Sequence, residues 1–90
     1  MNFWDAQVVA ITGGSGSLGN ALARLLLAEP VKAVRIISRD EEKQRVMQQR
    51  ISDQRLRCLI GDVRDRDRLR RAFDGADIAI HCAAMKQIPA

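Results

Sequence analysis

The sequence has no tyrosine, only 3% aromatic residues, two cysteines and no long apolar run. Its apolar stretches fall well short of the roughly 18 residues that a membrane-spanning helix needs. The first residues, MNFWDAQ, carry no basic residue ahead of the apolar segment, which argues against a secretory signal. We therefore expect a cytoplasmic protein without a membrane partner. Cys58 and Cys82 lie in strand-like runs without metal-ligand spacing, so we interpret them as buried thiols and expect no metal site.

The charge balance is basic, with a formal net charge of +4 and a pI near 9.8. Most of the excess lies in RLRCLIGDVRDRDRLRR, where arginines alternate with Asp65 and Asp67. Aromatic side chains for stacking on single strands are scarce, and a helix face that carries both signs of charge is usually solvated. Nucleic-acid binding is therefore kept only as a third hypothesis, which predicts that affinity falls steeply with salt.

Four short apolar segments alternate with three helical patterns. The predicted strands are residues 7–12, 33–38, 55–60 and 77–82. Strand–helix alternation of this kind produces a parallel sheet with right-handed crossovers. We predict an α/β, Rossmann-like half-sheet (βαβαβαβ) with strand order 3-2-1-4, in which the fourth strand is an uncovered edge. A complete doubly wound domain has two such halves, so residues 1–90 are expected to be the N-terminal part of one NAD(P)-binding domain, cut from a longer protein.

The first helix carries leucines at helical spacing, namely Leu18, Leu22, Leu25 and Leu26. It is expected to end at Glu29, because Pro30 disfavours helical geometry in the residue before it. The second helix, within DEEKQRVMQQRIS, has few apolar residues and is expected to lie on the surface.

The third helix is expected to begin near Asp65 and to bury Leu69, Ala72 and Phe73. Its end is predicted at Asp74–Gly75, with the glycine as a left-handed C-cap.

The segment TGGSGSLG joins the first strand to the first helix with G-x-x-G-x-x-G spacing. Gly13 permits a sharp turn, Gly16 lets a pyrophosphate approach the backbone, and Gly19 allows close packing of helix and sheet. The free N–H groups of the helix point toward the phosphates, and Ser15 and Ser17 add hydroxyl donors. A strand before this motif and an amphipathic helix after it favour phosphate binding over an ordinary loop.

The end of the second strand bears on the choice of cofactor. An NAD site needs an acidic residue there to hold the ribose 2′-hydroxyl, but this position holds Ser38, followed by Arg39 and then Lys43. A hydroxyl and two cations match a 2′-phosphate, so NADP is favoured over NAD. Two alternatives stay open: the cations merely decorate the start of a helix, or Asp40 reaches the ribose.

Polar residues near the ends of the last two strands have more than one interpretation. Asp62 either accepts a hydrogen bond from the adenine amino group or, like Asp65, caps the following helix. His81, the only histidine, is expected to be structural and hydrogen-bonded rather than catalytic. Lys86 follows the last strand at the cofactor-facing edge, where it contacts cofactor or substrate or is solvated.

Four stretches, TGGSGSLG, SRDEEKQ, GDVRDRDRL and DIAIHCAAMKQIP, resemble in order and spacing the extended short-chain dehydrogenase/reductase superfamily. Within it they are most similar to the inverting UDP-N-acetylglucosamine 4,6-dehydratases of bacterial polysaccharide biosynthesis. The resemblance implies bound NADP, hydride removal from sugar C4, loss of water across C5–C6 and hydride return to C6. It also implies a nucleotide-sugar substrate and a homo-oligomeric whole enzyme. The cofactor contacts that it implies are Ser15, Gly16, Ser17, Leu18, Ser38, Arg39, Lys43, Asp62, Val63, Cys82 and Lys86, the last of which also touches substrate.

Some features depart from this pattern. Cys82 stands where alanine is usual, Met85 replaces a leucine and Gln87 replaces a histidine. The superfamily's Tyr-x-x-x-Lys pair, in which lysine lowers the pKa of the tyrosine so that it takes the alcohol proton, has no tyrosine to supply it here. We therefore assign no catalytic residue and expect these 90 residues to be inactive alone. The alternative function is a stand-alone, non-catalytic dinucleotide-binding or interaction module.

Overall fold

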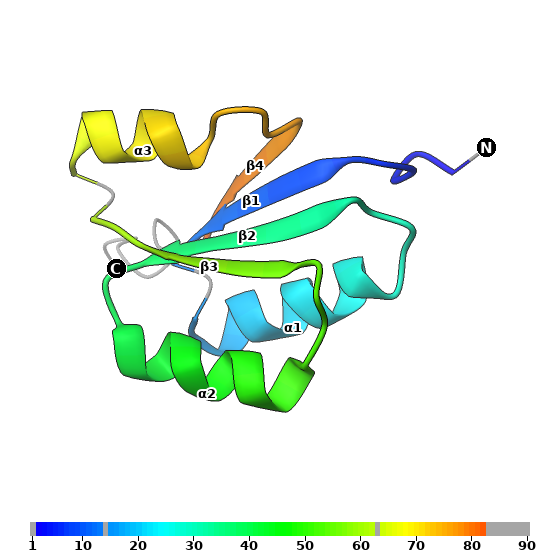
Figure 1. Cartoon of the computed structure of the whole chain (residues 1–90), viewed down its shortest axis with the longest axis horizontal. Coiled ribbons are helices and arrows are strands. Elements are labelled where there is room, and N and C mark those ends of the chain that lie inside the picture. Colours follow the sequence, from blue (N-terminus) through cyan, green and yellow to red (C-terminus); the bar gives the residue numbers. More distant parts are fainter. Residues whose placement is uncertain (1, 14, 63, 83–90) are drawn as a thin grey trace, which may run out of the picture.

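The computed structural model, which describes residues 2–13, 15–62 and 64–82, is a parallel sheet with helices on both faces (Figure 1). Its strands are β1 (Val8–Thr12), β2 (Ala33–Ser38), β3 (Leu56–Ile60) and β4 (Ile78–His81). Its helices are α1 (Ser17–Leu27), α2 (Glu41–Ile51) and α3 (Arg66–Ala72). The strand order β3-β2-β1-β4 confirms the predicted Rossmann-like class and its topology. Within the described ranges, no helix has the length and apolarity to cross a membrane.

The strands start and end close to their predicted limits. β2 has the predicted bounds, whereas the other three lose a residue at one or both ends. Gln7 and Arg55 lie just outside the ladders, where their backbone N–H groups bond to the Trp4 carbonyl and the Asp53 carboxylate in the adjoining turns. Asp77 precedes β4, and its N–H donates to the carbonyl of Val8 in β1. All three strand pairings are parallel, so the carboxyl ends of β1, β2, β3 and β4 meet at one edge of the sheet.

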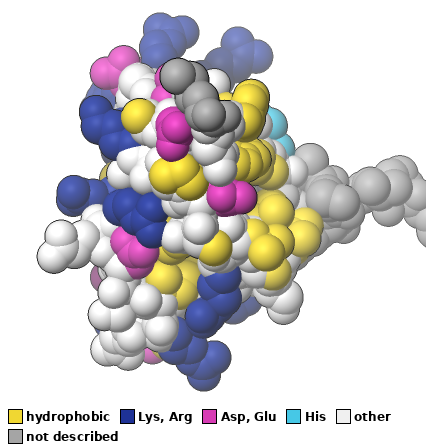
Figure 2. Space-filling view, turned by 90° about the vertical axis from the view of Figure 1, so that its right-hand side faces the viewer, with side chains coloured by type: hydrophobic (Ala, Val, Ile, Leu, Met, Phe, Trp, Pro, Cys, Tyr) yellow, Lys and Arg dark blue, Asp and Glu magenta, His cyan; other side chains and the backbone are white. Residues whose placement is uncertain are grey.

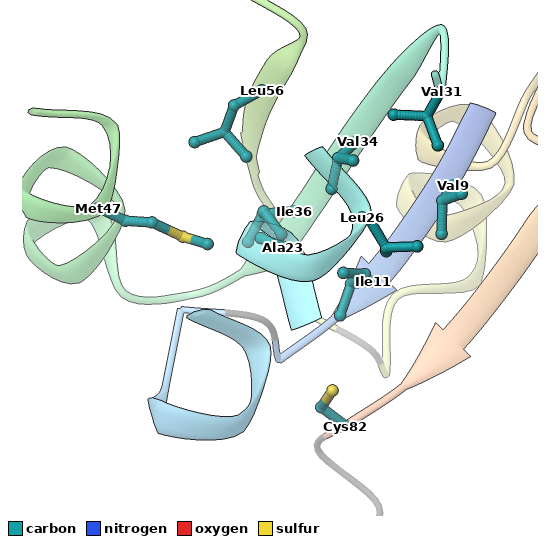
Figure 3. Close-up of a cluster of buried hydrophobic side chains, with 10 residues drawn as sticks. All are labelled: Val9, Ile11, Ala23, Leu26, Val31, Val34, Ile36, Met47, Leu56 and Cys82. Atoms are coloured by element: carbon teal, nitrogen blue, oxygen red, sulfur yellow. The ribbon is translucent and has the colours of Figure 1, made fainter. Parts of the chain in front are cut away.

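Alternate side chains of the strands pack on opposite faces, as the pleat requires. α1 and α2 cover one face and α3 covers the other (Figure 1). The larger core cluster lies on the α1/α2 face and contains Val9, Ile11, Ala23, Leu26, Val31, Val34, Ile36, Met47, Leu56 and Cys82. Figure 3 shows Met47 extending from α2 toward Ile36. A smaller cluster of Ala10, Ile37 and Ala72 holds α3 against the opposite face.

Helix α1 buries a narrower face than the leucine pattern predicts. Leu26 is buried together with Gly19 and Ala23, but Leu18 is 44% and Leu25 is 68% exposed. The two exposed leucines lie seven residues apart and therefore share one face of the helix, which points away from the sheet. The prediction that the helix ends at Glu29 was wrong by two residues, since α1 ends at Leu27.

Helix α2 is a surface helix, as expected, with an inward face of only two fully buried residues. Met47 is 1% exposed, and Gln44, one turn before it, is 4% exposed. A polar residue in that position was not anticipated from the sequence.

Helix α3 begins as predicted, with Asp65 as its N-cap, but the predicted glycine C-cap was wrong. The helix ends at Ala72 and its cap, Phe73, has right-handed geometry. Gly75 has a φ of 77° in the turn that follows. The guanidinium of Arg35 donates to the carbonyls of Ala72 and Asp74. These bonds satisfy the last carbonyl of α3 and the carbonyl of Asp74 in the turn that follows.

Strand β4 is an edge of the sheet, as predicted, with β1 as its neighbour. Ile78 and Ile80 are half-buried against the α1-side core, and Ala79 is exposed on the other face. Figure 2 shows apolar side chains gathered on one part of the face in view, with basic and acidic side chains over the rest of it.

Candidate functional site

The glycine segment forms a tight turn between β1 and α1. Gly13 has a φ of 69°, a left-handed conformation that L side chains rarely adopt. Its N–H donates to the carbonyl of Ile37 at 2.7 Å, so the turn begins while the chain is still bonded to β2. Gly16 is the N-cap of α1, with an extended backbone and no side chain to bond the first N–H groups of the helix. Those N–H groups are therefore open to an external acceptor.

Asn20 holds this turn from inside the first turn of α1. Its side-chain amide donates to the carbonyls of Ser15 and Gly16 at 3.2 and 3.1 Å. These bonds direct the two carbonyls toward the helix and away from any anion near the N–H groups. The sequence analysis did not assign Asn20 a role, although an amide one turn after a glycine cap is the signal that points to it.

An open hollow of about 580 Å³ lies where β1 and β2 end and α2 begins. Its lining residues are Gly13, Ser15, Gly16, Ser38, Arg39, Asp40, Glu41 and Lys43. Thus the fold brings the glycine turn and the residues after the second strand into one place. The hollow lies at the carboxyl ends of parallel strands, which is where ligands bind in open α/β sheets.

A second hollow of about 500 Å³ runs between α1 and α2 and adjoins the first. It shares Ser15, Gly16 and Lys43 with the first hollow, and Ser17 is added to its wall. Lys43 therefore faces the space on both sides of the glycine turn.

A buried hydrogen-bond network stands behind the first hollow. The hydroxyl of Ser15 donates to the hydroxyl oxygen of Ser38 at 3.1 Å, and the side-chain nitrogen of Gln44 donates to the same oxygen at 3.0 Å. Ser15 and Ser38 are 9% and 7% exposed. Two of the predicted phosphate ligands are thus bonded to each other and to a residue that the sequence analysis did not single out.

A cluster of charged groups lies beside the hollow, where β3 ends. The carboxylate of Asp62 accepts bonds from the backbone N–H and guanidinium of Arg64, and Arg39 lies 3.7 Å from the same carboxylate. The hydrogen bonds from Arg64, with smaller attraction from Arg39, lower the pKa of Asp62 to about 2. Asp62 is therefore a carboxylate at neutral pH and does not cap α3, a role that Asp65 has.

The acidic residue after Arg39 has a structural function at the start of α2. The carboxylate of Asp40 accepts a hydrogen bond from the backbone N–H of Lys43 at 2.9 Å and caps the helix. This bond occupies one carboxylate oxygen, while the side chains of Arg39 and Lys43 line the hollow.

Other predicted site residues lie apart from the two hollows or outside the described part. Leu18 and Gly19 follow in α1, with Leu18 exposed and Gly19 buried. Cys82 is 3% exposed in the core cluster beyond β4. Val63 and Lys86 lie outside the described residues.

The remaining polar groups at the strand ends support the structural interpretation of His81. Its Nδ1 lies 3.0 Å from the hydroxyl of Thr12, and its ring meets that of Phe73 edge-on at 5.9 Å.

Both cysteines lie in the described part and remain thiols. Burial raises the pKa of the Cys58 thiol.

A family model described as polysaccharide biosynthesis protein matches residues 9–90. The chain is 44% identical over 87 residues to a UDP-glucose 4-epimerase of Rickettsia massiliae, a match that covers 92% of the chain and 26% of the relative. It is 36% identical over 88 residues to an uncharacterized membrane protein of Methanocaldococcus jannaschii. This match covers 98% of the chain and 26% of that protein. The chain thus spans about a quarter of the length of these curated relatives.

Solved structures share the fold. Pen from Bacillus thuringiensis superposes with a TM-score of 0.82 at 36% identity, covering 87% of this chain and 24% of that one. A wide-type short-chain dehydrogenase/reductase from Veillonella parvula in complex with NADP superposes with a TM-score of 0.68 at 21% identity, covering 83% of this chain and 34% of that one. The latter likeness concerns the fold alone.

Proposed function

The chain belongs to the polysaccharide biosynthesis protein family, of the extended short-chain dehydrogenase/reductase type, and from that membership we propose that it is the NADP-binding N-terminal segment of a nucleotide-sugar 4,6-dehydratase. The rest of that enzyme supplies the sugar-nucleotide pocket and the Tyr-x-x-x-Lys pair. The whole enzyme is a homo-oligomer in this proposal.

One observation carries the cofactor assignment. The glycine turn, with the open N–H groups of α1, lines the same hollow as Ser38, Arg39 and Lys43. The turn offers backbone donors for a diphosphate. The end of β2 offers a hydroxyl and two cations for a further phosphate. A dinucleotide that carries a 2′-phosphate needs both sets at this spacing.

The character of the donors supports NADP rather than NAD. The described residues that line the hollow include two acids: Asp40 caps α2 through its carboxylate, and Glu41 is the first residue of that helix. Arg39 and Lys43 present positive charge at the same rim. The residues present thus fit a dinucleotide phosphate, and the nicotinamide of such a cofactor, when bound, supplies hydride transfer.

Other predicted site residues enter the proposal through the family resemblance. They are Leu18, Asp62, Val63, Cys82 and Lys86, with Lys86 also assigned to the substrate, while Gly19 enters through the glycine motif. Of these, Asp62 is a carboxylate beside Arg39, a position that suits acceptance of a hydrogen bond from an adenine amino group.

The cofactor assignment is tested with Arg39→Ala. Binding of NADPH and NADH to the complete protein that contains this chain is titrated by nucleotide fluorescence, with Arg45→Ala as the matched control. Arg45 also belongs to the α2 region and is 65% exposed, but it pairs with Glu42 at 2.6 Å. Loss of a charge-assisted bond should weaken NADPH binding about tenfold or more, while the affinity for NADH changes little. Equal losses for both nucleotides would show that Arg39 does not bind the 2′-phosphate.

The reaction is tested on the complete reading frame that contains this chain. Incubation with UDP-N-acetylglucosamine should yield a product lighter by one water, as a 4,6-dehydratase produces. A relative named UDP-glucose 4-epimerase favours a second candidate, epimerisation, for which the product has the mass of the substrate. Mass spectrometry of the nucleotide sugar separates the two reactions.

A further inference from the structure

The buried amide of Gln44 has a defined orientation. Its side-chain nitrogen lies 2.9 Å from the carbonyl oxygen of Leu59 and 3.4 Å from that of Ser38. Carbonyl oxygens only accept hydrogen bonds, so the group that faces them is the NH₂ end of the amide and not its oxygen. Gln44 therefore joins the ends of β2 and β3 as a donor from α2.

This orientation determines what the Ser38 hydroxyl can do. Its oxygen accepts from the Gln44 nitrogen at 3.0 Å and from the Ser15 hydroxyl at 3.1 Å. Two incoming donors occupy both lone pairs of a hydroxyl oxygen. The hydroxyl hydrogen of Ser38 is then the part left for a ligand. If the bond between the serines runs the other way, the spare hydrogen belongs to Ser15, which lines the same hollow.

We propose that Gln44 is a specificity-determining positioning residue, which holds the Ser15–Ser38 hydroxyl pair as a hydrogen-bond donor and so favours a phosphate monoester over a hydroxyl on the bound ribose. The inference rests on the proposed function, since it concerns the same hollow. Gln44 acts through Ser38: it is 4% exposed, whereas Ser38 lines the hollow beside Arg39.

The chemistry of the two ribose substituents explains the preference. A phosphate monoester at neutral pH offers acceptor oxygens and negative charge, and it gains a charge-assisted bond from a donor hydroxyl. A ribose 2′-hydroxyl is both donor and acceptor. Against the Ser38 hydroxyl, whose oxygen already accepts from Gln44 and Ser15, it accepts one neutral bond and leaves its own hydrogen without this partner. The Gln44 bond thus adds to the selectivity that Arg39 and Lys43 supply through charge.

The test compares Gln44→Met with Gln48→Met in the complete protein that contains this chain, using NADPH and NADH as probes. Methionine keeps the length of the side chain but has no donor, and Gln48 is an exposed residue one turn further along α2. Gln44→Met should weaken NADPH binding about tenfold and NADH binding less than threefold. The reason is that a hydrogen bond to a charged acceptor is stronger than one to a neutral acceptor. Gln48→Met should change neither. An equal loss for both nucleotides, or no loss, would overturn the proposal.

A double-mutant cycle with Ser38→Ala then separates positioning from general packing. If Gln44 acts through the Ser38 hydroxyl, the two substitutions together should weaken NADPH binding no more than Ser38→Ala alone. Losses that multiply would show independent roles and overturn the proposal. If the complete protein that contains this chain binds neither nucleotide saturably, the proposed function itself fails, and the inference fails with it.

A measurement on the unmodified chain covers the case in which Gln44→Met does not fold. The side-chain ¹⁵N–¹H signals of Gln44 should exchange slowly with solvent and shift on addition of NADPH much more than on addition of NADH. Signals that exchange as fast as those of Gln48, or that shift equally with both nucleotides, contradict the proposal.

Discussion

The guanidinium of Arg39 lies 3.7 Å from the carboxylate of Asp62. This pair links the ends of β2 and β3 beside the hollow. The distance exceeds that of a normal hydrogen bond, and the side chain of Arg39 is 70% exposed. Such an exposed pair is worth little. Asp62 therefore restrains Arg39 only weakly and leaves the N–H donors of Arg39 available to a phosphate.

The same carboxylate predicts how stability depends on pH. The bonds from Arg64 lower the folded-state pKa of Asp62 from its ordinary value of 3.8 to about 2. A depressed folded pKa contributes stability that is fully present above the unfolded pKa and is lost as pH falls from about 4 through 2. Urea unfolding should therefore show Asp62→Asn less stable than the wild type at pH 6, with a gap that closes toward pH 2. Asp67→Asn, at an exposed site in α3, is the control, and a gap that is constant with pH would contradict the assignment.

Gly16→Ser should separate folding from cofactor binding. Gly16 has a φ of −82° and a ψ of −173°, which any residue adopts, and serine is a good N-cap. Folding stability should be unchanged or a few tenths of a kcal/mol higher. The added side chain lies at the wall of the hollow and should therefore weaken NADPH binding. Gly13→Ala is the contrasting variant: its left-handed φ of 69° should cost about 1 kcal/mol of folding stability. Thermal melts and NADPH titrations of both variants check this, and unimpaired binding by Gly16→Ser would argue against close approach of phosphate.

Arg35→Met should loosen α3 from the sheet. Arg35 donates to the carbonyl of Ala72 at 3.0 Å and also to that of Asp74, so its loss leaves the end of α3 without these donors. We expect the free energy of unfolding to fall by about 1–2 kcal/mol. Arg57→Met is the matched control, because Arg57 lies directly opposite Arg35 in β3 and is exposed. Equal effects of the two substitutions in urea unfolding would show that the Arg35 bonds contribute nothing specific.

The sequence predicted the elements well where the signal is local. Strand β2 has its predicted bounds, and the N-cap of α3 at Asp65 follows from side-chain chemistry within one turn. The C-terminal end of α3 was mispredicted because its carbonyls are satisfied by Arg35, a residue that is distant in sequence. Similarly, the leucine pattern of α1 does not distinguish Leu26, which faces the core, from exposed Leu25.

By itself, the sequence determined the order of strands and helices, the glycine turn and the cations that follow β2, because periodicity, backbone freedom and charge belong to neighbouring residues. Tertiary structure decided which of these groups meet. Only the parallel pairing of β1, β2 and β3 brings Ser15 to Ser38 and places the amide of Gln44 behind both. The physical reason is that a buried amide must find its acceptors within about 3 Å. The acceptors of Gln44 come from two strands whose separation in the chain says nothing of their distance in space.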